Sequence, residues 1–316
     1  MSIIIHIGLP KTATTTLQNA LFANHSQIFY LGKTLGSSAF KGCTTKEWCE
    51  LLKPVIWEVN KSCDVDSLRA LYSRKLEAEH AVGRKVIGSW ESLGRRPARQ
   101  NLEMVGRISS VSGGCRLMIS LRNPLVHLPS LYLQQIKGHF VARNKAFMGD
   151  AMFMEFDEWY SQMNSREPGA CDVNAHLETI RMASEILGKE NVGVFLFEDL
   201  IKDPDRYYQS ICEFIGVDVE EGLSLVRQKH LHKRIRQGQL DWLRKVNASS
   251  WRKRLLRCLG SRRRSRLFNG VKNDLSPARV TLSGEMTESI SAATRDGHRW
   301  LVDHYGLPLE THGYPL

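Results

Sequence analysis

Four short apolar runs, separated by segments with helical patterns, constrain the fold of this 316-residue chain more than any other feature. The runs cover residues 2–7, 85–89, 116–121 and 192–197. Each run is nearly continuous in apolar residues, which is typical of strands that are covered on both faces in a parallel sheet. Strands that alternate with helices predict an α/β fold with three layers, in which helices flank a central parallel sheet.

The clearest helix is predicted over residues 203–215. Asp203 is a suitable N-cap, Pro204 fits the first turn, and Gly216 follows the last apolar residue. Residues at helical spacing predict two further helices, one directly after the first strand and one that ends at Gly188. Their marker residues are Leu17, Ala20 and Leu21 in the first, and Leu177, Ile180, Ser184 and Leu187 in the second.

Composition and cysteine usage predict one self-supporting domain over residues 1–316. Hydrophobic residues make up 42% and charged residues 24% of the chain, as in ordinary folded proteins. A chain of this length buries roughly 75% of its surface on folding and needs no disulfide or metal to stabilise it. The seven cysteines form no C-x-x-C pair, and His230 and His232 lack a third ligand, which argues against a zinc site. Because the N-terminal apolar run is too short for a signal peptide, we expect a cytoplasmic location.

The strongest charge asymmetry lies in residues 227–266, where fifteen Lys and Arg stand against a single acid, Asp241. Trp242, Trp251 and several leucines are interspersed among these charges and give the stretch an amphipathic, partly helical pattern. Three interpretations stay open: a solvated face, a site for an acidic ligand, and contact with an anionic membrane surface. Nucleic-acid binding is disfavoured because no recognition motif or stacking pattern accompanies the charge.

An anion-binding loop is predicted where the first strand passes into its helix. The connecting residues are Gly8-Leu9-Pro10-Lys11-Thr12-Ala13-Thr14-Thr15-Thr16. A chain that turns from strand to helix directs unbonded N–H groups at the helix N-terminus, where phosphate or sulfate is favoured. Lys11 adds a full charge and the threonines add hydroxyl donors, although a threonine-rich helix cap is the alternative. The P-loop of nucleotide triphosphatases needs G-x-x-x-x-G-K-[ST], which is absent, so a small-molecule kinase is disfavoured.

A second phosphate motif follows the third predicted strand. That strand ends in Leu121-Arg122-Asn123-Pro124, and Ser130 comes eight residues after Arg122. Arg122 can offer a bidentate fork and Ser130 a hydroxyl to one phosphate group, which suits a terminal phosphate monoester.

Together the two motifs resemble those of PAPS-dependent sulfotransferases of the bacterial and glycan type. Residues 7–15 are similar to the family's 5′-phosphosulfate loop, G-x-P-K-[ST]-G-[ST]-[ST], and the Arg122 and Ser130 pair is similar to its 3′-phosphate site. Residues 197–204 and 307–315 resemble family segments over the rest of the chain. Two departures are Ala13, where glycine is usual and where a Cβ crowds the phosphosulfate unless φ is negative, and His127, where arginine is frequent.

The resemblance implies a P-loop-like fold, PAPS as sulfuryl donor, adenosine 3′,5′-bisphosphate as product and no required metal. It implies that Lys11 stabilises the leaving oxygen and that Glu91, just after the second predicted strand, is the base. The alternatives for Glu91 are a solvated loop residue or a partner for a lysine, and His6 is a competing titratable group more typical of a core. The cofactor-binding residues implied are Pro10, Lys11, Thr12, Ala13, Thr14, Thr15, Thr16, Arg122, Ser130 and, from a late basic loop, Arg262.

Two functions from different classes follow. The first is a PAPS-dependent O-sulfotransferase that acts on a hydroxyl of a glycan, glycolipid or small metabolite, with acceptor contacts within residues 32–84 and 137–172. The second is a noncatalytic nucleotide-binding or membrane-surface docking protein that retains the fold. In either case, the membrane interpretation of residues 227–266, which stays open beside the other two, implies a peripheral location at the inner membrane surface.

Overall fold

A five-stranded, all-parallel sheet forms the centre of the computed structural model, which describes residues 2–32, 52–142, 152–164, 174–227 and 235–316. The strand order is β2-β3-β1-β4-β5. Their bounds are β1 Ile3–Gly8, β2 Ile28–Tyr30, β3 Lys85–Ser89, β4 Cys115–Leu121 and β5 Val192–Leu196. The four predicted strands are confirmed, with ends displaced by at most one residue. The three-residue edge strand β2 was not predicted, because its apolar run is too short to stand out from a loop.

Side chains of the sheet alternate between two apolar cores, one on each face. Ile5 and Leu117 pack on one face with α3, α4 and α8, whereas Ile4 and Met118 pack on the other with η1, α10 and α11. The predicted α/β fold with helices on both faces of a parallel sheet is therefore confirmed. The helix bounds are α3 Val65–Ala81, α4 Ala98–Ser112, α8 Ala175–Leu187, η1 Leu17–Phe22, α10 Pro204–Ile215 and α11 Val219–Arg227.

Local signals fix the ends of the predicted helices. The Asp203 side chain caps α10 by accepting a hydrogen bond from the Arg206 amide (3.1 Å), and Gly216 ends the helix with φ of 81°. Gly188 follows the last residue of α8 with φ of 82°, and its amide donates a hydrogen bond to the Ser184 carbonyl (3.0 Å). The helix after β1 begins as α1, Thr14–Thr16, and continues as the more loosely wound π-helix η1.

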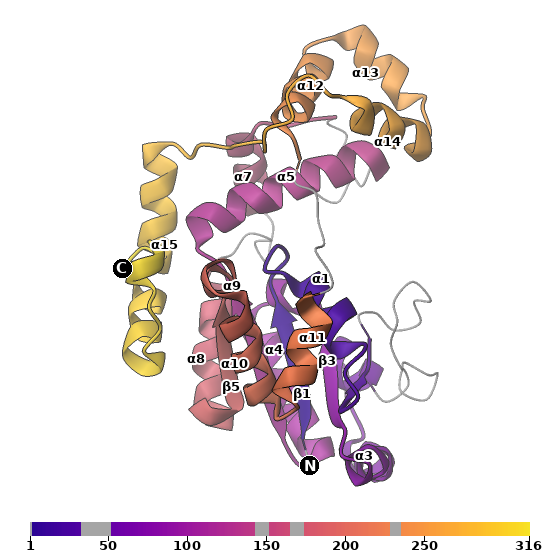
Figure 1. The fold of residues 1–316 in the computed structure, drawn as a ribbon, viewed down its shortest axis with the longest axis vertical. Helices are drawn as coiled ribbons and strands as arrows, with labels where there is room; N and C mark the ends of the chain where they lie inside the picture. Colours follow the sequence, from indigo (N-terminus) through magenta and orange to yellow (C-terminus); the bar gives the residue numbers. More distant parts are fainter. Residues whose placement is uncertain (1, 33–51, 143–151, 165–173, 228–234) are drawn as a thin grey trace.

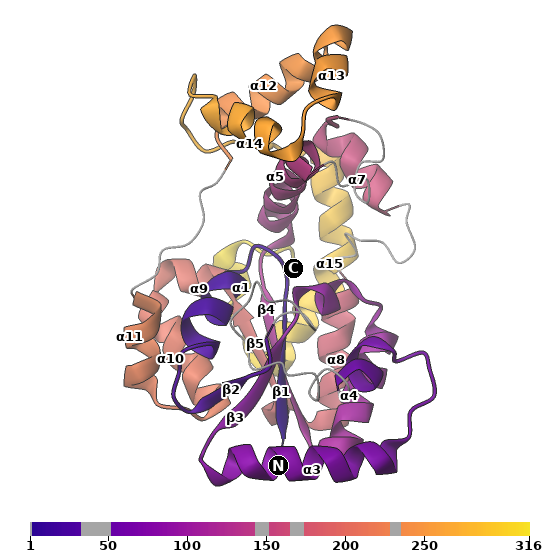
Figure 2. The same cartoon turned by 90° about the vertical axis from the view of Figure 1, so that its right-hand side faces the viewer.

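A second group of helices lies beyond the carboxyl ends of the strands and has its own apolar core (Figure 1). The long helix α5 leads from β4 into this group, and α15 returns from it to the side of α8 (Figure 2). Residues 237–270, which include most of the basic stretch, fold as α12, α13 and α14. The bounds are α5 Pro124–Ala142, α7 Phe156–Asn164, α12 Gln237–Asn247, α13 Ser250–Arg257, α14 Ser261–Gly270 and α15 Gly284–Tyr305.

The C-terminal tail fixes the turn between β4 and α5. Asn123 Nδ2 donates hydrogen bonds to the carbonyl oxygens of His312 (3.1 Å) and Gly313 (2.8 Å). Glu198 joins both segments, because its Oε1 accepts from the Asn123 amide (3.0 Å) and its Oε2 accepts from the Tyr314 hydroxyl (2.8 Å). The short helices are η2 Lys53–Trp57, η3 Glu91–Arg95, η4 Lys189–Asn191, α9 Phe197–Lys202 and η5 Glu310–His312.

Two surveys of the described residues add to this outline. None of their helices is both long enough and apolar enough to span a membrane. Four of the seven cysteines lie in the described ranges, and all four are free thiols: Cys63, Cys115, Cys212 and Cys258.

Candidate active site

The loop between β1 and α1 holds the most strained backbone in the described structure. Lys11 has φ of 73° and Ala13 has φ of 61°, and within the described ranges no other non-glycine residue has a positive φ. This left-handed conformation costs an L-residue roughly 1–2 kcal/mol. Strain of this kind persists only where the surroundings dictate the conformation, and it gathers at functional sites.

Two side chains of the β4–α5 segment hold the loop from outside. His127 Nε2 donates a hydrogen bond to the carbonyl oxygen of Pro10 (2.8 Å), and Arg122 Nη1 donates one to the carbonyl oxygen of Lys11 (3.0 Å). His127, which stands where the family often has arginine, therefore anchors the loop. The sequence alone did not reveal this role, since the two bonded residues are 117 positions apart.

The loop's amide groups are available to an anion. Among the described residues, the N–H groups of residues 12–15 have no backbone acceptor, whereas the Thr12 hydroxyl donates inward to the Leu9 carbonyl (2.6 Å). Successive unbonded amides next to a helix N-terminus form a site for phosphate or sulfate. Lys11, half-buried in the same loop, adds positive charge. Thr15 and Thr16 are half-buried in α1, at the start of the helix.

Gly8 permits the tight passage from strand to loop. A Cβ at this position would lie 2.2 Å from the Thr14 methyl group and 2.7 Å from Cε1 of His6. His6 is fully buried beneath the loop, and its Nδ1 and Nε2 are hydrogen-bonded to the hydroxyls of Ser89 (2.7 Å) and Ser120 (3.1 Å). Burial lowers the pKa of His6 to about 4, and the nearby Glu91 charge opposes this shift only in part. His6 is thus a neutral, satisfied core residue at neutral pH.

The structure brings together the two residues predicted to bind a terminal phosphate. Arg122 Nη1 lies 3.4 Å from Ser130 Oγ while it also bonds the Lys11 carbonyl. The Arg122 side chain is 9% exposed and its guanidinium lies 4.5 Å from the centre of the Phe197 ring. The second phosphate motif therefore adjoins the first.

Glu91 lies against the opposite side of the loop. It begins η3 directly after β3, the strand paired with β1, and its Oε1 accepts a hydrogen bond from the Thr14 hydroxyl (2.5 Å). The predicted catalytic carboxylate and the loop thus meet at the carboxyl edge of the sheet. Ligands of open α/β sheets bind at this edge, where the chain's connections diverge to the two sides of β1.

Arg262 is not brought to the loop. It is exposed on α14, whose neighbouring residue Arg264 is buried and bonds the carbonyl oxygens of Val141 and Leu259. Val141 lies eleven residues beyond Ser130 on α5, which is about 17 Å along the helix axis. Figure 1 shows α14 at the far end of α5 from the sheet.

Several predicted features fall partly or wholly outside the described residues. His230 and His232 are among them, as are parts of the two segments expected to contact the acceptor, residues 33–51, 143–151 and 165–172. In the described ranges, no three His, Cys, Asp or Glu side chains are grouped as a metal site would require.

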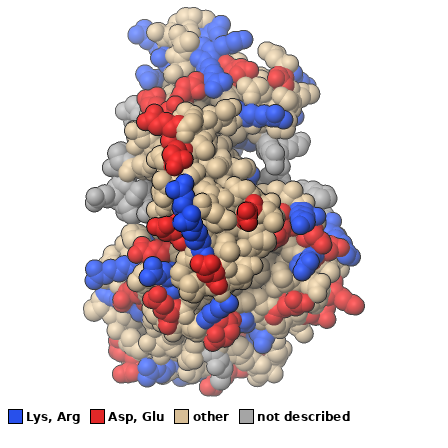
Figure 3. All heavy atoms as spheres, turned by 90° about the vertical axis from the view of Figure 1, so that its left-hand side faces the viewer, with Lys and Arg blue, Asp and Glu red and all other residues tan. Residues whose placement is uncertain are grey.

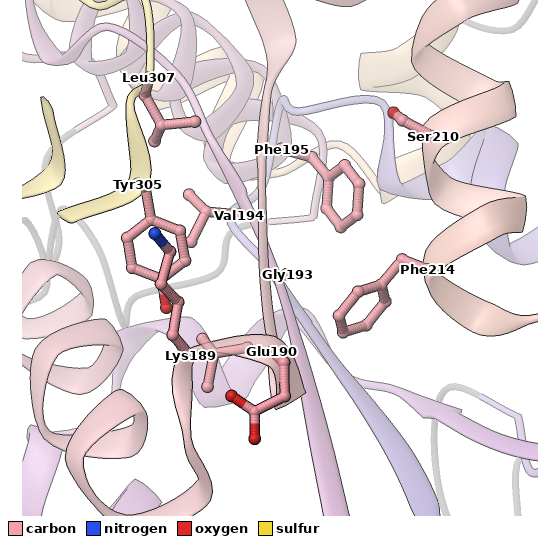
Figure 4. Close-up of a pocket in the computed structure, with 10 residues that line it drawn as sticks. Lys189, Glu190, Gly193, Val194, Phe195, Ser210, Phe214, Tyr305 and Leu307 are labelled. Carbon is pink, nitrogen blue, oxygen red and sulfur yellow. The ribbon is translucent and has the colours of Figure 1, made fainter.

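A cavity of about 510 Å³ lies away from the loop, beside the edge strand β5 (Figure 4). Val194 and Phe195 line it from β5, Phe214 from α10, and Tyr305 and Leu307 from the end of α15 and the tail. None of the predicted site residues borders it.

Comparisons with solved structures find sulfotransferases at low identity. One, from Alicyclobacillus acidocaldarius, is 18% identical over 69% of this chain and 81% of that chain, with a TM-score of 0.42. Sulfotransferase STF9 from Mycobacterium avium is 13% identical over 87% of this chain and 78% of its own, with a TM-score of 0.42. Mouse sulfotransferase SULT7A1, complexed with PAP, is 15% identical over 72% of this chain and 64% of its own, with a TM-score of 0.38.

No curated protein matches the sequence. The model of the sulfotransferase domain family, however, matches residues 2–267, which include the loop, Glu91 and the Arg122 and Ser130 pair. On this match, the chain belongs to the sulfotransferase domain family.

Proposed function

We propose that this family member is a PAPS-dependent O-sulfotransferase whose acceptor is a hydroxyl of a glycan, glycolipid or small metabolite, and that residues 1–316 act as one domain. The observation that carries the proposal is a convergence of three groups at the carboxyl edge of the sheet. These are the strained anion loop, the Arg122 and Ser130 pair, and the Glu91 carboxylate. Arg122 is hydrogen-bonded to the loop at the Lys11 carbonyl, and Glu91 is hydrogen-bonded to it at the Thr14 hydroxyl.

The residues present fit the two acidic ends of PAPS. The unbonded amides of residues 12–15 and the Lys11 ammonium suit the 5′-phosphosulfate, whereas Arg122 and Ser130 suit the 3′-phosphate. The residues suited to the 5′-phosphosulfate and those suited to the 3′-phosphate adjoin at Lys11, because Arg122 donates a hydrogen bond to the Lys11 carbonyl oxygen. PAPS supplies, when bound, an activated sulfuryl group and a phosphate leaving group.

Lys11 has the central role in the proposed chemistry. Sulfuryl transfer, by analogy with phosphoryl transfer, passes through a loose transition state in which charge gathers on the leaving oxygen. A preorganised cation and backbone donors stabilise that charge without reorganisation during the reaction. The left-handed backbone at Lys11 and the hydrogen bonds to its carbonyl and to that of Pro10 hold the donors in place. This role requires no metal ion.

Glu91 takes the proton of the acceptor hydroxyl in this proposal. Its hydrogen bond with Thr14 holds one carboxylate oxygen beside the loop, which supports a role as general base for an acceptor bound there. His6, the other titratable side chain nearby, already has both ring nitrogens engaged and is fully buried. Glu91 is therefore the better base.

One observation favours the second candidate, a noncatalytic nucleotide-binding protein. A negative φ at Ala13 would keep its Cβ clear of a phosphosulfate. The observed φ is positive, so the Cβ is expected to crowd that group. A protein of this kind would bind adenosine 3′,5′-bisphosphate and release none from PAPS with any acceptor.

The test is turnover of PAPS, measured as release of adenosine 3′,5′-bisphosphate across a panel of sugars, glycolipids and small alcohols. We expect turnover by the wild type and a loss of about 10³- to 10⁵-fold in Lys11→Ala, the range seen when a cation is removed from a phosphoryl-transfer site. Lys202→Ala, which removes an exposed lysine of α9, is the matched control and should retain full activity. Unchanged turnover in Lys11→Ala refutes the role of Lys11, and binding of the nucleotide without any turnover by the wild type favours the second candidate.

A further inference from the structure

The helix α13 presents large apolar side chains to solvent. Trp251 is 65% exposed and Leu255 is 57% exposed, and their spacing of four residues places them on one face of the helix. Leu256, 5% exposed, packs instead into the core of the outer helices. Leu267 of α14 is also 46% exposed. In Figure 1, α13 lies at the end of the molecule furthest from the N-terminus.

The segment that carries these apolar side chains is strongly basic, although Arg244 at its start is ion-paired with Glu155 (2.9 Å) and Asp241 (3.4 Å). Residues 242–273 contain no Asp or Glu. In Figure 3, Lys and Arg gather at the tip of this end of the molecule, with Asp and Glu beside and below them, and charges of both signs are interspersed over the rest of this face. The exposed basic residues of α12, α13 and α14 are Arg244, Lys245, Arg252, Arg254, Arg257, Arg262, Arg263 and Arg266.

The exposed apolar side chains of α13 and the basic residues around them differ from ordinary exposed apolar side chains. Val82 and Ile201 are each 64% exposed, but Ile201 lies between Asp199 and Asp203 and Val82 stands alone at the end of α3. Isolated apolar side chains of this kind are normal on protein surfaces. An aromatic and an aliphatic side chain on one face of a helix that itself contains no acidic residue have the character of an interfacial amphipathic helix.

We propose that α13 docks on an anionic membrane surface, with Trp251 and Leu255 inserted at the boundary of headgroups and acyl chains. The flanking arginines, Arg252 and Arg254 among them, bind the lipid phosphates. A soluble polyanion would satisfy the arginines but would leave both apolar side chains in water, so the apolar pair favours a bilayer. This inference is independent of the proposed sulfotransferase activity, because none of the catalytic groups lies on α13.

The first arm of the test measures co-sedimentation of the full chain with vesicles. Phosphatidylcholine vesicles with phosphatidylglycerol should bind the protein, and vesicles of phosphatidylcholine alone should bind it at least about tenfold less, since several basic residues near an anionic surface each strengthen binding. The variant Trp251→Ala/Leu255→Ala should bind anionic vesicles about tenfold more weakly, as partial burial of two apolar side chains implies. Val82→Ala/Ile201→Ala removes equally exposed side chains elsewhere and should bind as the wild type does.

The second arm distinguishes a bilayer from a soluble polyanion. Arg252→Gln/Arg254→Gln should weaken vesicle binding, whereas Arg99→Gln/Arg206→Gln, which removes exposed arginines of α4 and α10, should not. Brominated lipids should quench part of the wild-type tryptophan fluorescence, and this part should vanish in Trp251→Phe.

Three results overturn the proposal. The first is failure to bind anionic vesicles. The second is vesicle binding by Trp251→Ala/Leu255→Ala that equals that of the wild type. The third concerns heparin, used as a soluble polyanion. Heparin binding that is weakened only by the arginine substitutions, together with no bromolipid quenching of Trp251, would indicate a site for soluble polyanions. Far-UV circular dichroism of each variant checks that it is folded, as expected for substitutions at solvent-exposed positions.

Discussion

The loop at the carboxyl edge of the sheet and the outer helices α12 to α14 use positive charge in opposite ways. At the loop, Arg122 is 9% exposed and its position is fixed by contacts with Lys11, Ser130 and Phe197. On α13, arginines such as Arg254 are exposed. Chemistry on a substrate needs donors held in place before the reaction, whereas attraction to a charged surface needs only charge that the surface can reach.

Arg264 shows that a position within a basic run of the sequence does not determine whether an arginine is exposed or buried. It lies in the run Arg262-Arg263-Arg264, yet it is 4% exposed and its guanidinium satisfies backbone carbonyls at the end of α5. Its neighbours in the run are exposed. One helix thus takes one arginine into its core for structure and presents the others to solvent.

After the loss of turnover expected in Lys11→Ala, the next largest effect is expected at Glu91. Glu91→Gln removes a proton acceptor and keeps the shape, so kcat should fall by about 10²- to 10⁴-fold. Glu103→Gln on α4 is the exposed control. A fall of kcat by less than about threefold removes Glu91 as the base.

The next effect is the contribution of His6, buried beneath the loop, to the pH dependence of the free energy of unfolding. Burial lowers the pKa of His6 from its ordinary value of 6.5 to about 4 in the folded protein, so the unfolded chain takes up a proton first as the pH falls. His6 therefore lowers the free energy of unfolding progressively from about pH 6.5 down to about pH 4, below which the loss is complete. Between about pH 7.5 and 5.0 its share is about 2 kcal/mol.

This share can be isolated by substitution. His6→Gln keeps a polar side chain at the position and removes the titration, so urea unfolding should show a pH dependence smaller by about 2 kcal/mol over the same interval. The quantity compared is the change in the free energy of unfolding between the two pH values. A loss of stability that is the same at both pH values therefore cancels. An unchanged pH dependence would show that His6 is not buried as a neutral group.

A third prediction compares one arginine from each region. Arg122→Gln should weaken binding of adenosine 3′,5′-bisphosphate by about 10- to 100-fold, since charged hydrogen bonds contribute about 1.5–3 kcal/mol. Arg262→Gln should change it by less than about threefold, because Arg262 is an exposed residue of α14, which lies at the far end of α5 from the sheet, and exposed charges are largely screened beyond about 10 Å. Equal losses in calorimetry would show that the outer helices contribute to the nucleotide site and would erase the contrast.

The smallest effect is expected at Ala13. Ala13→Gly removes the Cβ beside the loop amides, whereas relief of the left-handed backbone, about 1 kcal/mol, affects the free and the bound protein alike and changes only the free energy of unfolding. We expect adenosine 3′,5′-bisphosphate to bind about two- to fivefold more tightly, which corresponds to about 0.5–1 kcal/mol. Weaker binding would mean that Ala13 is adapted to its position and does not crowd the anion.

The sequence predicts the features that depend on neighbouring residues. Apolar runs locate β1, β3, β4 and β5, and Asp203 and Gly216 mark both ends of α10. The strand-to-helix passage likewise identifies the anion loop, because its signal lies within nine consecutive residues, 8–16.

Contacts between distant segments could not be predicted in this way. His127 and Pro10, Glu91 and Thr14, and Tyr314 and Glu198 are paired across 77 to 117 positions, and nothing local in either partner specifies the other. The place of α14 depends in the same way on how α5 directs the outer helices away from the sheet.

The measurement that tests the central claim most directly is a calorimetric titration of the purified protein with adenosine 3′,5′-bisphosphate, with ADP and AMP as analogues that lack the 3′-phosphate. If the loop and the Arg122 and Ser130 pair form one nucleotide site, the bisphosphate should bind with micromolar affinity and both analogues about tenfold or more weakly. Equal affinities for all three nucleotides would contradict the account, because the two phosphate motifs would then not act on one ligand.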